Sequence, residues 1–222
     1  MSSSKPWSIA SVVVALLVYA AMWIGYAQNW VWLDAVDTQL LQTFHNIGAT
    51  HPGWVSFWDV FCTVLGPNGF RVIALVFVIV ALVRRNVATA VFLVISVGLM
   101  GVVTEGAKFI AGRPRPATAL VYGSSTSFPS GHALGVMVGV LALLTALWPS
   151  LTRRWRAILA VLGGVLVVLV GSARVVLNVH HPSDVLAGWA LGYLYYLLCM
   201  RLVPPRGIRA AAETRAAPDT GQ

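Results

Sequence analysis

The stretch of sequence from position 129 to position 148 reads PSGHALGVMVGVLALLTALW. Its first four residues are polar or turn-forming. Residues 133–148 are almost wholly apolar, as expected of a helix that crosses the roughly 30 Å hydrocarbon core of a membrane. Five similar apolar runs occupy residues 9–27, 70–83, 87–110, 157–173 and 185–202. We therefore expect an all-α fold, a polytopic membrane helical bundle with six transmembrane helices.

The overall composition agrees with a membrane protein. Of the 222 residues, 58% are hydrophobic and only 10% are charged, whereas a soluble domain carries about 25% charged residues. The net charge of +8 would also suit a nucleic-acid-binding protein. However, the cations lie mostly between the apolar runs and not on one polar face, so we expect membrane lipids, and no nucleic acid, as partners.

A mixed region, residues 28–69, separates the first two apolar runs. Apolar residues recur there at helical spacing, with three polar residues off the stripe: Leu33, Val36, Leu40, Leu41 and Phe44 on it, and Asp34, Asp37 and Gln42 off it. This pattern predicts an additional amphipathic helix at the membrane surface, and we expect it to border the path that lipid takes to the site. A second apolar piece, residues 54–65, ends at the turn sequence GPNG.

Lysine and arginine divide unevenly between the two sides of such a bundle. One side, which both termini share, holds ten of them: Lys5, Arg84, Arg85, Arg153, Arg154, Arg156, Arg201, Arg206, Arg209 and Arg215. The other side holds five: Arg71, Lys108, Arg113, Arg115 and Arg174. Because cations gather on the cytoplasmic side, we expect cytoplasmic termini and a second side that faces the periplasm or exterior. Residues 1–203 then form one membrane-embedded domain, and residues 204–222 a disordered cytoplasmic tail.

The first polar cluster lies at the end of the third apolar run. A lone Lys108 there is also explained, though less well, by a side chain that reaches the lipid headgroups. Arg115 follows seven residues later between two prolines, which stiffen the chain and fix the direction of the arginine. A guanidinium matches two phosphate oxygens, and an ammonium adds a compact positive charge. Arg113 suits headgroup contact as well as substrate contact.

The second cluster opens the fourth apolar run. Ser130 is well placed as a helix N-cap, and Gly131 allows the backbone to approach a ligand closely. The free N–H groups at a helix N-terminus bind anions, although ordinary capping explains the same two residues. Capping does not explain His132 at the mouth of a membrane helix.

The third cluster joins the last two apolar runs. Arg174 ends the fifth run, and Pro182 suits the first turn of the sixth helix. His180 and Asp184 are four residues apart, close enough for the carboxylate to orient the ring and raise the nucleophilicity of its far nitrogen. His181 lies three residues before Asp184, so spacing alone leaves both histidines open.

These residues resemble the three signature motifs of the type 2 phosphatidic acid phosphatase superfamily. They read Lys-x6-Arg-Pro from Lys108, Pro-Ser-Gly-His from Pro129, and Arg-x5-His-x3-Asp from Arg174. The resemblance covers roughly residues 70–200, the core of the predicted domain. One departure is Ala173, because the family's third motif usually begins Ser-Arg.

The resemblance implies a role for each matching residue. His180 would be the nucleophile in preference to His181, Asp184 would orient it, and His132 would be the general acid. The phosphoryl oxygens would be bound by five residues: Lys108, Arg115, Ser130, Gly131 and Arg174. A phosphohistidine would form and then be hydrolysed, with the cations in the place of a metal, so that no cofactor is expected.

The implied function is that of an integral-membrane hydrolase of lipid phosphates or polyprenyl diphosphates, with phosphatidic acid, phosphatidylglycerol phosphate and undecaprenyl diphosphate among the candidate substrates. Two alternatives stay open. Vanadium-dependent haloperoxidases resemble the same superfamily but are typically soluble. A non-catalytic lipid-phosphate binder or transporter would need none of the catalytic histidines. The two cysteines, Cys62 and Cys199, form no CxxC motif, and the sequence shows no metal-ligand cluster.

Overall fold

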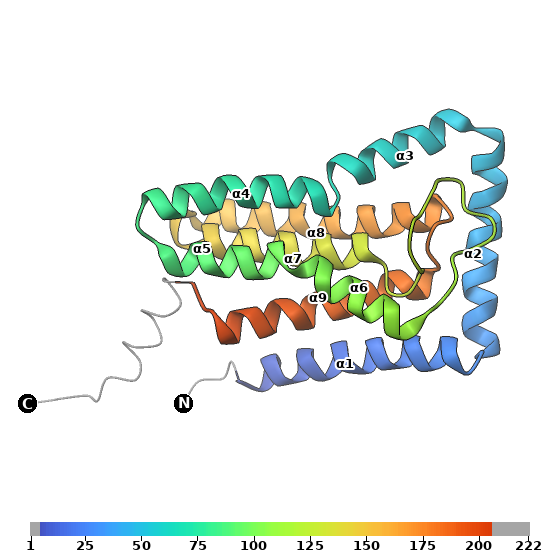
Figure 1. Ribbon diagram of the computed structural model, residues 1–222, viewed down its shortest axis with the longest axis horizontal. Coiled ribbons are helices and arrows are strands. Elements are labelled where there is room, and N and C mark those ends of the chain that lie inside the picture. Colours follow the sequence, from blue (N-terminus) through green and yellow to red (C-terminus); the bar gives the residue numbers. More distant parts are fainter. Residues whose placement is uncertain (1–4, 206–222) are drawn as a thin grey trace, which may run out of the picture.

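The computed structural model describes residues 5–205, and this part of the chain is helical and contains no strand. Figure 1 shows its helices in order. They are α1 Lys5–Ala27, α2 Val31–Thr50, α3 Pro52–Val64, α4 Pro67–Val83, α5 Val87–Leu93, α6 Met100–Ala111, α7 Gly131–Leu147, α8 Arg153–Val176 and α9 Pro182–Leu202. A π-helical turn, Val94–Gly98, joins α5 to α6, and a short 3₁₀ turn, Trp148–Ser150, follows α7.

Within residues 5–205, six helical segments are long and apolar enough to cross a membrane. They span Ile9–Ala27, Pro52–Val83, Val87–Ala111, Gly131–Ser150, Arg153–Val176 and Pro182–Leu202. The predicted all-α membrane bundle with six spans is therefore confirmed. The second span is longer than the predicted run 70–83, because α3 adds to α4 with only a bend at Gly66 between them.

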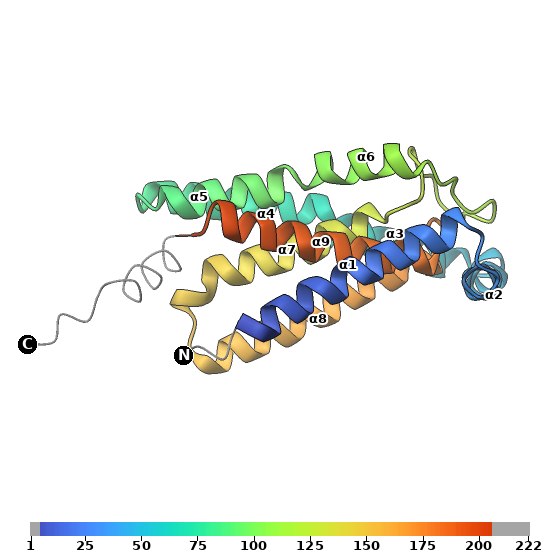
Figure 2. The same cartoon turned by 90° about the horizontal axis from the view of Figure 1, so that it is seen from below.

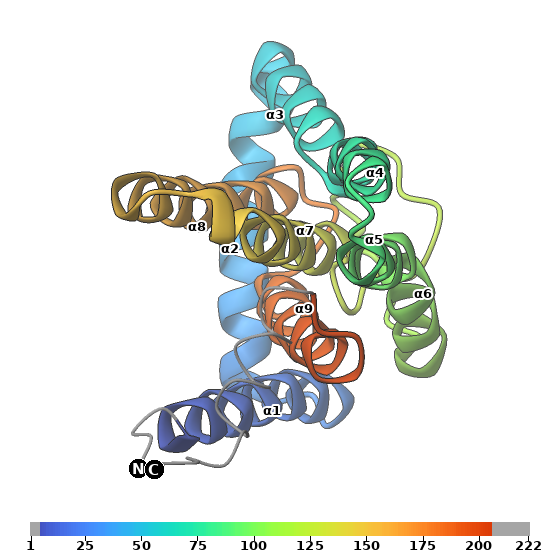
Figure 3. The same cartoon turned by 90° about the vertical axis from the view of Figure 1, so that its left-hand side faces the viewer.

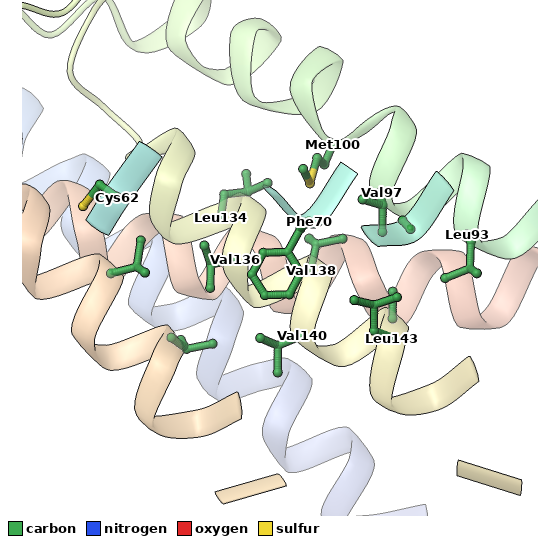
Figure 4. Close-up of a cluster of buried hydrophobic side chains, with 14 of the residues drawn as sticks. Cys62, Phe70, Leu93, Val97, Met100, Leu134, Val136, Val138, Val140 and Leu143 are labelled. Atoms are coloured by element: carbon green, nitrogen blue, oxygen red, sulfur yellow. The ribbon is translucent and has the colours of Figure 1, made fainter. Parts of the chain in front are cut away.

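Helix α7 forms the centre of the bundle, with α4, α5, α8 and α9 around it (Figure 3). Its buried apolar side chains, Leu134, Val136 and Val138 among them, pack with Phe70 of α4 in the main core (Figure 4). Helix α9 approaches α7 closely because Gly188 has no side chain: a Cβ at this position would lie 2.6 Å from the Ser130 carbonyl oxygen. This close packing brings the start of α7 beside the start of α9.

The π-helical turn precedes α6, which lies apart from α4 (Figure 1). The Tyr195 hydroxyl donates a hydrogen bond of 2.6 Å to the carbonyl oxygen of Ile95 inside this turn. A π-helical turn alters the regular hydrogen-bond pattern, so a side-chain donor is well placed there. Residues of both α4 and α6 line the cavity described below.

Helix α2 lies across one end of the bundle, nearly perpendicular to α1 (Figures 1 and 2). The predicted helix is confirmed. Leu33, Asp37 and Leu41 form the buried face, whereas Val36 and Leu40 are 46% and 39% exposed. Asp37 was placed among the polar residues off the stripe; it is buried because it pairs with an arginine from another segment.

The two ends of the bundle consist of different helix ends and links. The start of α1 and the end of α9 lie at one end, together with the α4–α5 and α7–α8 connections (Figure 1). Helix α2 and the long link between α6 and α7 lie at the other end. All three polar clusters belong to this second end. The predicted cytoplasmic tail begins at residue 204, and all but its first two residues lie outside the described part of the chain.

Candidate active site

A cavity of about 620 Å³ opens between α4, α6, α7 and the link after α6. Predicted site residues from all three clusters line it: Lys108, Arg115, Gly131, His132, Arg174 and His180. Ser130 and Asp184 do not line the cavity but are buried behind its wall. Residues up to 72 positions apart in the sequence thus meet in one place.

Helix ends position these side chains. Lys108 lies in the last turn of α6, which Gly112 ends in the left-handed conformation at φ 62°, a region that favours glycine. Ser130 is the N-cap of α7, as predicted, and its hydroxyl oxygen accepts a hydrogen bond from the Ala133 amide. Arg174 lies in the last turn of α8, and His180 belongs to the short link before α9. Each cluster therefore sits where a helix begins or ends at the same end of the bundle.

His180 presents its two ring nitrogens to different surroundings. Nδ1 lies 3.5 Å from Asp184 Oδ2, and also 3.5 Å from the hydroxyl of Ser127, which itself donates to Asp184 Oδ2. Nε2 lies 3.2 Å from Nη1 of Arg115, on the cavity side. Burial lowers the pKa of His180 to about 4, although the neighbouring Asp184 opposes this shift. The ring is therefore neutral at pH 7.

His181 also contacts Asp184, but in a different role. Its backbone N–H donates to Asp184 Oδ2 at 2.8 Å, and its Nδ1 lies 3.2 Å from the same oxygen. His181 is the N-cap residue of α9, and together with Asp184 it forms a capping box. It does not line the cavity. The fold thus separates two histidines that spacing alone left equivalent.

Three cations line the cavity, and two of them, Lys108 and Arg115, are held by hydrogen bonds to neutral oxygens. Lys108 Nζ donates to the Ser125 hydroxyl at 2.6 Å, and lies 3.6 Å from the exposed Glu105. Arg115 donates from Nε to the Ser125 carbonyl and from Nη1 to the Val179 carbonyl, both at 2.8 Å. The buried Arg174 Nε has no hydrogen-bond partner. A buried guanidinium with a free donor is well suited to an anionic ligand.

Arg113 fulfils neither of its two predicted roles. It is buried, with Nη2 2.9 Å from Asp37 Oδ2 and Nη1 2.7 Å from Asp184 Oδ1. It therefore contacts neither headgroups nor the cavity, and its charge is balanced inside the protein. The alternating Arg-Pro sequence gave no indication of this, because the two acidic partners come from α2 and α9.

Several residues at the site were not anticipated. Ser125 accepts hydrogen bonds from Lys108 and Arg115, and Ser127 donates one to Asp184. In the sequence, the two serines are marked only by a serine-rich stretch just before Pro129. Arg71 lines the cavity from α4 and was counted only as one of the outer cations. Ala173 is fully buried and Ser172 points outward, so Ser172 does not replace the hydroxyl that the third motif lacks.

Among the described residues, no three His, Cys, Asp or Glu side chains come together as a possible metal site. Cys62 lines the cavity and Cys199 is buried in α9, and both are free thiols. The polar groups that line the cavity are mainly cations and neutral hydrogen-bond donors. The lining also contains one glutamate, Glu105, which lies beside Lys108. Such a lining can bind a phosphate group, neutralise its charge, and present a neutral imidazole to it.

Two known proteins are similar to this chain in sequence. The chain is 32% identical to phosphatidylglycerophosphatase B of Bacillus subtilis over 170 residues, 75% of this chain and 73% of that protein. It is 36% identical to an undecaprenyl-diphosphatase of Sulfolobus acidocaldarius over 116 residues, 49% of this chain and 52% of that protein.

The fold has a counterpart among solved structures. The crystal structure of a transmembrane PAP2 type phosphatidylglycerolphosphate phosphatase from Bacillus subtilis superposes with a TM-score of 0.57 at 23% sequence identity. The match covers 95% of this chain and 98% of that one, and so shows a shared fold. A sequence model of the PAP2 superfamily matches residues 89–208, more than half of the chain. The chain therefore belongs to the PAP2 superfamily.

Proposed function

We propose that the protein is a membrane phosphatase that hydrolyses a lipid phosphate or a polyprenyl diphosphate through a phosphohistidine intermediate. The observation that carries this proposal is that His180 lines the same cavity as Lys108, Arg115 and Arg174, with its Nε2 3.2 Å from Nη1 of Arg115. The activities named for the two curated relatives, on phosphatidylglycerophosphate and undecaprenyl diphosphate, support the same substrate classes.

In the first step, His180 Nε2 attacks the phosphorus of the terminal phosphate. A nitrogen–phosphorus bond forms while the bond to the leaving oxygen breaks, and His132 donates a proton to that oxygen. The ring of His180 gains positive charge, which the buried Asp184 carboxylate beside Nδ1 stabilises. Neutral His180 is the reactive form, in agreement with its lowered pKa.

In the second step, a water molecule replaces the alcohol or the lipid monophosphate that has left. His132, now neutral, accepts a proton from the water as its oxygen attacks phosphorus. The nitrogen–phosphorus bond breaks, inorganic phosphate forms, and His180 returns to its neutral state. The protons balance, because the one that His132 gave in the first step it regains in the second.

The cations stabilise the charge that moves onto the equatorial oxygens of phosphorus. Arg174 contributes most to this role in our proposal, because its buried Nε has no protein partner and is free to bind an oxygen. Gly131 and the N-terminus of α7, capped by Ser130, add backbone N–H groups. Three fixed positive charges supply what a metal ion provides in many phosphoryl-transfer sites, so we propose a reaction without a metal.

By the topology predicted from the sequence, the side that carries the three polar clusters holds five of the fifteen lysines and arginines. The uneven charge distribution supports an extracytoplasmic site, in the periplasm or at the cell exterior, with cytoplasmic termini. A reporter that is active on only one side of the membrane, fused after Arg201 or inserted at position 117, tests this orientation.

The central experiment measures phosphate release from a panel of lipid phosphates and diphosphates by the purified protein in detergent, with and without EDTA. Wild-type protein should release phosphate at the same rate in both conditions. His180→Ala and His132→Ala should lose activity by at least 1,000-fold. The matched control is His51→Ala, an exposed histidine outside the cavity. Lipid binding without turnover in the wild type would refute the proposal in favour of a non-catalytic binder.

A further inference from the structure

Behind the cavity wall, a buried network connects α2 to the proposed catalytic pair. Its centre is Arg113, whose Nη2 donates to Asp37 Oδ2 at 2.9 Å. Nη1 of the same guanidinium donates to Asp184 Oδ1 and to the Ser183 hydroxyl, each at 2.7 Å. All four residues are buried, with Asp37 at 1% and Asp184 at 0% exposure. Two carboxylates from distant helices therefore share one arginine.

Asp37 also reaches α9 directly. Its Oδ1 accepts a hydrogen bond of 3.0 Å from the Ser183 backbone N–H, and its Oδ2 accepts one from the Ser183 hydroxyl. Ser183 is in the first turn of α9, where backbone N–H groups have no partner within the helix and the helix dipole favours negative charge. The Asp37 carboxylate thus binds the N-terminus of the helix that carries Asp184.

The network fixes which oxygen of Asp184 faces His180. Arg113 occupies Oδ1, while Oδ2 contacts Ser127, the His181 backbone and the His180 side of the site. A rotation of the carboxylate would break the bond to the buried Arg113 and leave its charge poorly paired, which is costly. The orientation of Asp184 consequently depends on Arg113, and that of Arg113 depends on Asp37.

A second contact from α2 acts on the same region. His45 Nδ1 lies 3.1 Å from the carbonyl oxygen of Thr118, in the link that carries Arg113 and Arg115. The Thr118 hydroxyl in turn donates to the Asn178 side chain at 2.8 Å, two residues before His180. Helix α2 therefore holds both chain segments that meet at the nucleophile.

We propose that Asp37 is a positioning residue for the reaction: through Arg113 and Ser183 it holds Asp184 in the orientation that serves His180. This inference rests on the proposed phosphatase function. Asp37 lies outside residues 89–208, the part that matches the superfamily. It touches neither the cavity nor His180, so its effect on the rate must pass through Arg113, Ser183 and Asp184.

The test compares Asp37→Asn with Asp34→Asn, an exposed aspartate on the same helix. Phosphate release is measured as kcat and KM on one lipid substrate. Asp37→Asn should lower kcat about 10- to 100-fold and change KM less than about threefold, since a small misplacement of a reacting group costs up to about 100-fold in rate. Asp34→Asn should match the wild type, and Asp37→Glu should recover part of the lost kcat because it restores the charge.

A double-mutant cycle shows whether Asp37 acts through Arg113. The Arg113→Gln substitution removes the contact with Asp184, so it should lower kcat more than Asp37→Asn does. Adding Asp37→Asn to Arg113→Gln should then cause little further loss. Full additivity of the two losses would mean that Asp37 acts independently of Arg113 and would overturn the inference. So would a well-folded Asp37→Asn protein with wild-type kcat.

Ser183→Ala keeps the inference testable if Asp37→Asn does not fold. This smaller change removes a hydroxyl that links Arg113 to Asp37, and it should lower kcat several-fold without a change in KM. Wild-type kcat in Ser183→Ala would then refute the proposed network. A wild-type protein that releases no phosphate from any lipid would refute the proposed function itself, an outcome that is distinct from an active wild type with an indifferent Asp37.

Discussion

Lowering the pH should leave His180 neutral until about pH 4, a property that can be measured on the side chain itself. The ring is buried, and burial lowers its pKa from 6.5 to about 4. A pKa of about 4 in place of 6.5 means that the site disfavours the imidazolium by about 3 kcal/mol relative to water. At pH 5, roughly nine-tenths of the His180 rings are then neutral, compared with about 3% of ordinary histidine side chains.

The assay is a titration followed by nitrogen NMR on protein labelled with ¹⁵N-histidine in detergent. The chain has five histidines, and His180→Asn identifies the signal of His180 by its loss. The midpoint should lie near pH 4, and kcat/KM, corrected for substrate ionisation measured separately, should hold its plateau to about pH 5. A His180 midpoint at pH 6 or above would refute the reasoning, because the ring would then not be desolvated as the structure requires.

The same shift has a consequence for stability, with a defined sign. The pKa of His180 is lower in the folded protein than in the unfolded chain, so the unfolded chain binds the proton more readily. The resulting stability is fully present above about pH 6.5 and is lost as the pH falls toward 4. The free energy of unfolding of the His180→Asn protein should therefore change less with pH over this interval.

Four further substitutions have outcomes that the structure predicts. Arg174→Met should lower kcat/KM by at least about 100-fold yet leave the thermal unfolding midpoint equal or higher, because its buried Nε has no partner to lose. Gly188→Val should lower the free energy of unfolding by about 2 kcal/mol, since its Cβ would collide with the Ser130 carbonyl oxygen. Arg71→Gln should raise KM about tenfold for a diphosphate and less for the monophosphate of the same lipid, because Arg71 lines the cavity as an additional cation. Serine at both Val36 and Leu40 should leave the ratio of kcat/KM between long- and short-chain substrates unchanged, because neither residue lines the cavity.

The spans were predictable from the sequence because a membrane helix must satisfy its backbone internally and expose apolar side chains to lipid, which leaves a local signature. Helix ends were equally local: Ser130 and Pro182 mark the starts of α7 and α9 as expected. The bend at Gly66 that joins α3 to α4 was visible only as a turn sequence. Whether such a turn reverses the chain or merely bends a span depends on packing, which the sequence does not display.

The contacts of the site were less predictable, for the same physical reason. Asp37 and Arg113 are 76 positions apart, and each looks solvent-exposed or lipid-facing until the other is known. The choice between His180 and His181 depended on the path of the short link before α9, since both rings lie near the same carboxylate oxygen. Local spacing restricts which groups can meet, but the burial of a charge is decided by partners from elsewhere in the chain.

The position of α2 gives it contacts with the site that its amphipathic pattern does not predict. The cavity walls come from α3, α4, α6, α7, α8 and the two links beside them, so the described residues of α2 line no part of the cavity. Helix α2 instead contacts the surroundings of the site through the buried carboxylate of Asp37, which binds the start of α9, and through His45 beside Thr118. A helix that positions Asp184 should affect all substrates in the same proportion, whereas a helix along the lipid path should affect long chains most. Comparing Asp37→Asn on long- and short-chain substrates therefore distinguishes the two roles, and an equal loss on both indicates positioning.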